Sequence, residues 1–180
     1  MLSPMRASTA VLLLVGVGCA DSPTAVPTDS QAPARLFSMA VHPAVPISAA
    51  CDLISSQLVS LQPPILQQLS AGECEMSHLG RVGLETLQTI NIVTGAQTAV
   101  TTYTTRAGDL LYATSIGNAT PIGNTTVAFS GTTTVTGGTG RFVGATGQMD
   151  ARGVVDNATG EGWLSLAGSI SYQPRARGGQ

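Results

Sequence analysis

Residues 131–172 read GTTTVTGGTGRFVGATGQMDARGVVDNATGEGWLSLAGSISY, a run of short segments of β-forming residues separated by glycine-containing turns. The residues that lead into this stretch, 125–136, alternate between two faces. One face is Thr, Ser and Ala, and the other carries Val127, Phe129, Thr133 and Val135. Alternation with a period of two, in β-branched residues, is typical of a strand with one buried face. We therefore predict antiparallel strands joined by tight turns.

The predicted turns are rich in glycine. Residues 137–140 read GGTG, and adjacent glycines permit the positive φ angles of a tight hairpin. We expect the next strand to begin at residues 141–143 and a further turn at residues 156–160, which read DNATG. The last strand is predicted at residues 163–172, with its apolar face formed by Leu164, Leu166 and Ile170.

Upstream of this stretch the same pattern predicts the remaining strands. Residues 75–93 are expected to hold the first of them, followed by strands at 96–105 and 109–116 and a loop at 117–124. The count to Tyr172 is seven or eight, a number that closes a small barrel. The predicted fold is an all-β antiparallel barrel over residues 75–174, with residues 175–180 as a flexible tail.

Three short motifs occur in order along this region: HLGR at 78–81, GDLL at 108–111 and GGTGRF at 137–142. Together with the closing strand they resemble secreted bacterial proteins that have an allene oxide cyclase or dirigent type of barrel. The resemblance covers roughly residues 75–174. It implies a small antiparallel barrel, and it implies no reaction, since the bacterial group has no assigned activity and no catalytic residue of the enzymes matches a position here.

The N-terminus has the features of an export signal. Arg6 precedes the short apolar segment 10–17, which is too short to span a bilayer. The segment ends in VGCA at 17–20, which resembles a bacterial lipobox with Cys19 as the acylated residue, although Gly16 stands where a leucine is usual. The alternative is an ordinary secretory leader. We predict a signal peptide at 1–18 and a membrane-anchored or secreted protein of the bacterial cell envelope.

Two further segments separate this leader from the predicted barrel. Residues 19–47 contain five prolines and many Ser, Thr and Ala residues, which indicates a semi-extended linker. Residues 48–74 carry apolar residues at helical spacing that are interrupted by Pro63 and Pro64, so we predict two short helices joined at the prolines. The alternative is a loop with some apolar contacts.

The three cysteines fit this organisation. If Cys19 carries lipid, Cys51 and Cys74 remain as an even pair in an oxidising compartment. We predict a disulfide between these two cysteines that joins the helical segment to the first barrel strand. The alternative is two buried free thiols.

The composition excludes several classes of function. Only 10% of the residues are charged and the net charge is −2, so the chain lacks the basic surface that nucleic acid requires. No spacing of histidines suggests a metal site, and no cofactor is predicted. We expect a monomer whose partners are the membrane, through its anchor, and a small apolar ligand or another envelope component.

A polar cluster is the remaining candidate site; its members are His78, Arg81, Asp109 and Arg141. His78 is either an acid/base at a barrel mouth or a structural residue, and we favour the structural interpretation. A non-enzymatic binding or structural role is therefore predicted, and a cyclase or isomerase is the alternative that the resemblance offers. Because aromatic residues are few, we expect no specific pocket and an interior filled by Val127, Phe129, Val135, Leu164, Leu166 and Ile170.

Overall fold

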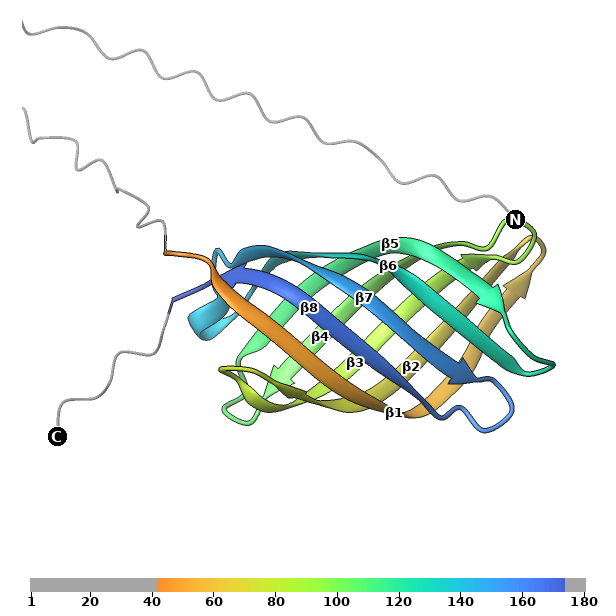
Figure 1. Cartoon of the computed structure of the whole chain (residues 1–180), viewed down its shortest axis with the longest axis horizontal. Coiled ribbons are helices and arrows are strands. Elements are labelled where there is room, and N and C mark those ends of the chain that lie inside the picture. Colours follow the sequence, from red (N-terminus) through yellow and green to blue (C-terminus); the bar gives the residue numbers. More distant parts are fainter. Residues whose placement is uncertain (1–41, 174–180) are drawn as a thin grey trace, which may run out of the picture. The chain divides into compact units, whose positions relative to one another are not determined.

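The computed structural model describes residues 42–173, which form a closed antiparallel barrel of eight strands (Figure 1). Each strand pairs with the next along the chain, and β8 closes the ring by pairing with β1. The strands are β1 (Val45–Gln62), β2 (Ile65–Met76), β3 (Gly80–Asn91), β4 (Ala96–Thr105), β5 (Leu110–Pro121), β6 (Thr126–Gly138), β7 (Thr146–Asp156) and β8 (Gly162–Ser171). The predicted leader, Cys19, most of the predicted linker and the predicted tail lie outside the described residues.

The predicted helical segment is wrong, because residues 48–74 lie in β1 and β2. These strands form a hairpin around Pro63 and Pro64, and β1 supplies the partner that β8 needs to close the barrel. Two irregularities in the β1–β2 register, between Leu53 and Ser55 and between Leu58 and Ser60, shift the inward face of β1. Such bulges break the period of two, which is why the apolar residues mimic helical spacing. The barrel therefore begins at Val45 rather than at residue 75.

Two smaller predictions also fail. Residues 141–143 do not start a strand: the 3₁₀ turn η1 (Gly140–Phe142) follows β6, and β7 begins only at Thr146. Residues 117–121, expected in a loop, continue β5. The β6–β7 connection and strand β5 are therefore longer than predicted, and the number of strands is unchanged.

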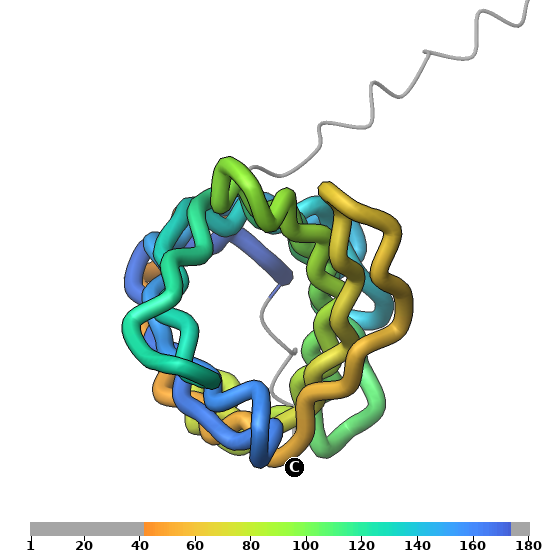
Figure 2. The backbone as a smooth tube through the Cα atoms, turned by 90° about the vertical axis from the view of Figure 1, so that its right-hand side faces the viewer, coloured from red at the N-terminus to blue at the C-terminus, as the bar shows by residue number. Residues whose placement is uncertain are grey.

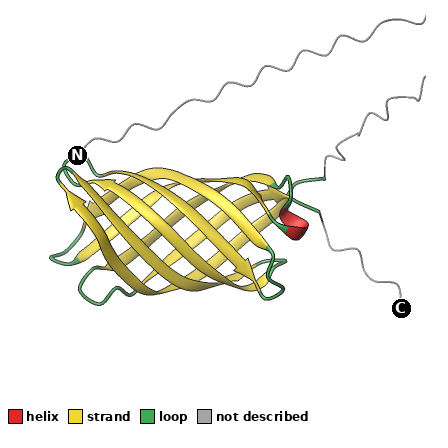
Figure 3. Cartoon of the chain, turned by 180° about the vertical axis from the view of Figure 1, so that it is seen from behind, coloured by secondary structure: helices red, strands yellow, loops and turns green. Residues whose placement is uncertain are grey.

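The two ends of the barrel differ. One end holds the β2–β3, β4–β5 and β6–β7 connections together with the start of β1, and η1 lies there (Figure 3). We call it the closed end. The opposite end holds the β1–β2, β3–β4, β5–β6 and β7–β8 connections, and Figure 2 looks into it along the ring of strands. We call it the open end.

Apolar side chains fill the barrel towards the closed end. Phe142 of η1 is fully buried, and its ring centroid lies 5.4 Å from that of Tyr172 after β8. The predicted inward positions Val135, Leu166 and Ile170 are buried in the same core. Other members of the core are Ile47, Leu53, Met76, Val82, Leu84, Tyr103, Leu111 and Met149. The prediction of which face of β6 and β8 points inward is thus confirmed.

Cys51 and Cys74 form a disulfide, as predicted. They are directly opposed partners on β1 and β2, and both side chains are buried in the core. The bond therefore joins two barrel strands to each other, rather than a helix to a strand.

Candidate functional site

A cavity of about 590 Å³ opens at the open end of the barrel. Its walls come from the inward faces of strands on several sides of the ring, and from the β3–β4 connection. The apolar part of the lining includes Leu58, Leu66, Ile90, Val127, Phe129 and Val155. The polar part is mainly side-chain amides, contributed by Gln68, Gln88, Asn91, Gln97 and Asn157.

This cavity corrects the prediction of a filled interior. Val127 and Phe129 were expected to fill the barrel, and instead they line the open space. Val135, Leu166 and Ile170, which were also expected to fill the barrel, are buried in the core towards the closed end. The apolar core therefore fills one end of the barrel and leaves space at the open end.

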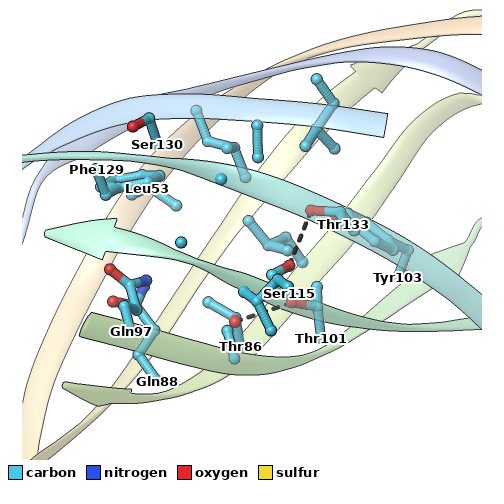
Figure 4. Close-up of a pocket in the computed structure, with 18 residues that line it drawn as sticks. Leu53, Thr86, Gln88, Gln97, Thr101, Tyr103, Ser115, Phe129, Ser130 and Thr133 are labelled. Carbon is cyan, nitrogen blue, oxygen red and sulfur yellow. Dashed lines mark hydrogen bonds between the residues drawn. The ribbon is translucent and has the colours of Figure 1, made fainter. Parts of the chain in front are cut away.

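A second, smaller pocket of about 50 Å³ lies deeper in the barrel (Figure 4). Gln88, Gln97 and Phe129 line both spaces, so they form the floor of the larger cavity. Hydroxyl groups around the small pocket are paired with each other, Thr86 with Thr101 at 2.9 Å and Ser115 with Thr133 at 2.8 Å. The deep hydroxyls therefore satisfy one another, whereas the floor presents amides.

The amides around the cavity are not equivalent. The Gln68 Nε2 atom donates a hydrogen bond of 2.9 Å to the Asn157 Oδ1 atom, so these two residues are partners. The Gln97 Oε1 atom is buried, and among the described residues it has no hydrogen-bond partner. Gln88 is only 6% exposed and lies beside the Gln97 region on the neighbouring strand, since Ile90 is the direct partner of Gln97. Gln97 therefore offers an acceptor to whatever enters the cavity.

The cavity is uncharged. None of the described residues that line the 590 Å³ space is Asp, Glu, His, Lys or Arg. Tyr103 lines the deeper pocket, and burial raises the pKa of its hydroxyl well above the usual value, which keeps the group neutral. Within residues 42–173, no group of His, Cys, Asp and Glu side chains is placed to hold a metal ion.

The predicted polar cluster lies at the closed end, away from this cavity, and only two of its four residues meet. The Arg141 Nε atom lies 3.6 Å from the Asp109 Oδ2 atom. The Arg141 guanidinium also lies 4.9 Å from the Phe142 ring centroid and 5.9 Å from that of Tyr172. Arg141 of η1 therefore contacts residues that adjoin β5 and β8.

The other two members of the predicted cluster are exposed. Arg81 on β3 forms an ion pair with Glu73 on β2, at the outer surface. His78 lies in the β2–β3 turn with a φ of 64°. Neither residue lines the cavity. The choice between the two interpretations of His78 therefore stays a prediction.

Sequence reasoning missed the amides. Gln88 and Gln97 occupy inward positions in strands that otherwise alternate regularly, with Thr86 and Ile90 as the inward neighbours of Gln88. A polar amide on the inward face of a strand was the available signal. An inward amide indicates a binding site only if the interior of the barrel is open. The alternation of residues along a strand does not show whether the interior is open or filled.

Comparison with protein-family models, curated proteins and solved structures finds no match for this chain. Among residues 42–173, no helix has the length and apolar character of a membrane-crossing segment.

Proposed function

We propose that this protein is an exported, lipid-anchored envelope protein that binds a small uncharged molecule in the open end of its barrel. The observation that carries the proposal is the cavity of about 590 Å³, with apolar walls and a few convergent amides. Ligand sites typically have volumes of about 300–1,000 Å³ and this kind of lining. An eight-stranded barrel is also wide enough to hold one small ligand.

The lining supports binding rather than catalysis. General acid–base chemistry needs a group that exchanges protons near the working pH. The described lining of the large cavity offers amides, hydroxyls and apolar groups, which orient a ligand without taking up or releasing a proton. A non-enzymatic role therefore fits the cavity better than the cyclase alternative.

The anchoring part of the proposal rests on the lipobox-like sequence that ends at Cys19. Replacing Cys19 with Ser is expected to move the protein from the membrane fraction to the soluble fraction while the leader is still cleaved. Unchanged partitioning, with no lipid mass on the mature N-terminus, would contradict the anchor.

Ligand binding is tested by filling the cavity. Ala119 on β5 lines it, and the Ala119→Phe variant places a ring in the space. The matched control is Ala167→Phe, on the exposed outer face of β8. Titration with the uncharged fluorescent probe N-phenylnaphthylamine should give binding to the wild type and the control, and at least about tenfold weaker binding to Ala119→Phe. Equal affinity for all three proteins would show that the cavity is not the site.

A further inference from the structure

We propose that the ligand is an uncharged amphiphile, such as a long-chain alcohol, bound with its hydrogen-bond donor at the cavity floor. The donor meets the Gln97 and Gln88 amides, and the apolar chain extends along the walls to the mouth. This inference rests on the proposed binding function and adds the chemical class and the orientation of the ligand.

The floor is the part of the cavity that needs a polar partner. The Gln97 Oε1 atom is buried without a hydrogen-bond partner among the described residues, and a buried acceptor in that state costs free energy. Figure 4 shows the Gln88 and Gln97 amides on the same side of the pocket. A ligand hydroxyl at this point donates to Gln97, and its oxygen still accepts from an amide N–H group. The Gln68 and Asn157 amides are hydrogen-bonded to each other, and among the described residues neither has a buried polar atom without a partner.

The depth of the cavity determines how far the polar end of a bound amphiphile can enter the barrel. Below the amides the remaining pocket is only about 50 Å³, which leaves room for a few atoms of the size of a water oxygen. A chain cannot pass this point. The polar end of a bound amphiphile therefore lies level with Gln88 and Gln97.

The apolar part of the ligand has a continuous apolar path outwards. Ile90 and Val127 line the space above the amides, and Leu66 and Val155 line it from other strands. At the mouth the lining continues in the β3–β4 connection, where Ile92 and Val93 are exposed to solvent. A molecule that is polar at one end and apolar along the rest matches this order of surfaces.

The same lining discriminates against ions. A carboxylate or an ammonium group at the floor would lose its water without gaining a countercharge, because the described lining of the large cavity carries no charge. Asp156 and Glu161, at the ends of the β7–β8 connection, add negative charge near the open end and disfavour anions further. The cavity therefore selects a neutral donor.

The test is a competition series on the mature chain, in which molecules that share a ten-carbon chain and differ in the polar group displace N-phenylnaphthylamine. The series is decanol, decyl methyl ether, decanoate and decylammonium. We expect decanol to bind about tenfold more tightly than the ether, which lacks the donor, and both ions to bind more weakly than decanol. The inference would be overturned if the ether bound as tightly as the alcohol, or if either ion bound more tightly than the alcohol.

The Gln97→Leu variant tests the contact itself. This variant should bind decanol about tenfold more weakly than the wild type does and should bind the ether with unchanged affinity. The preference for decanol over the ether then disappears. Gln148→Leu, on the exposed outer face of β7, is the matched control and should keep the preference. If circular dichroism shows that Gln97→Leu does not fold, Gln88→Leu replaces it with the same expectation. A preference that survives in the folded variant overturns the inference, whereas failure of every molecule, the fluorescent probe included, to bind the wild type contradicts the proposed function as well.

Discussion

The side chain of Gln68 on β2 donates a 2.9 Å hydrogen bond to Asn157 in the β7–β8 connection, 89 positions along the chain. β1 and β8 lie between β2 and β7 in the ring, so the bond reaches across the open end rather than along a pair of neighbouring strands. Gln68 is only 8% exposed. The bond thus ties a connection at the mouth of the cavity to a strand that is not its neighbour in the ring.

Removing one partner of this bond should lower the free energy of unfolding more than removing both partners. Asn157→Ala leaves the buried Gln68 amide unsatisfied, which should lower the free energy of unfolding by about 1–3 kcal/mol. The double variant Gln68→Leu/Asn157→Ala buries no unpaired amide and should be closer to the wild type than Asn157→Ala is. Urea denaturation of the wild type, both single variants and the double variant measures the coupling. Simple additivity of the two single effects would contradict the bond.

Arg141 should matter more for stability than Arg81. The side chains of the Arg141–Asp109 pair are 16% and 17% exposed, whereas those of the Arg81–Glu73 pair are 52% and 50% exposed. Arg141→Met keeps the stem of the side chain but removes the charge that lies beside Asp109 and over the rings of Phe142 and Tyr172. We therefore expect the free energy of unfolding to fall by about 2 kcal/mol. Arg81→Met, the matched control, should cost roughly 0–1 kcal/mol. Equal losses in urea denaturation would refute the structural role of Arg141.

The disulfide between Cys51 and Cys74 should stabilise the barrel by restricting the unfolded chain. The two cysteines are 23 residues apart, for which the chain-entropy model gives about 3 kcal/mol. The double variant Cys51→Ala/Cys74→Ala should therefore have a free energy of unfolding that is lower by about this amount. Because both sulfurs are buried in the core, reduction by dithiothreitol should be slow in buffer and accelerate in urea. Rapid reduction of the folded protein would contradict the buried position.

His78 is expected to affect stability and not binding. Its φ of 64° is unfavourable for a residue with a Cβ atom, although His tolerates it better than most. His78→Gly should therefore raise the free energy of unfolding by about 0.5–1 kcal/mol, and His78→Ala should lower the melting temperature slightly. Both variants should bind N-phenylnaphthylamine as the wild type does. Loss of probe binding in either folded variant would assign His78 a functional role.

Asp156 should make stability depend on pH in the acidic range. Hydrogen bonds from the Ala158 backbone, and then from the Thr125 side chain, lower the pKa of this carboxyl. A carboxyl with a lowered pKa stabilises the folded state above its unfolded pKa, about 3.9, and the contribution is lost as the pH falls through the folded pKa. Asp156→Asn should therefore be less stable than the wild type at about pH 7, and the difference should shrink as the pH falls through the lowered pKa of Asp156. A difference that is constant with pH would contradict this assignment.

Local sequence was sufficient for the strands that alternate without interruption. Val127 and Val135 in β6, and Leu166 and Ile170 in β8, point inward as predicted, because side chains in a strand alternate regardless of what the strand packs against. The pairing of Cys51 with Cys74 was likewise accessible from the count of cysteines and the expected export of the chain. The polar cluster around His78 was not, since the structure brings only Asp109 and Arg141 together.

The N-terminal strands and the cavity depend on contacts between distant parts of the chain. Bulges in β1 hide its period of two, and the need of β8 for a partner selects a strand over a helix. The floor of the cavity exists because the β3–β4 register places Gln88 and Gln97 on neighbouring strands, where both side chains line the interior. Alternation in one strand determines which residues point inward. What they meet there is decided by the register between strands, which only the closed barrel sets.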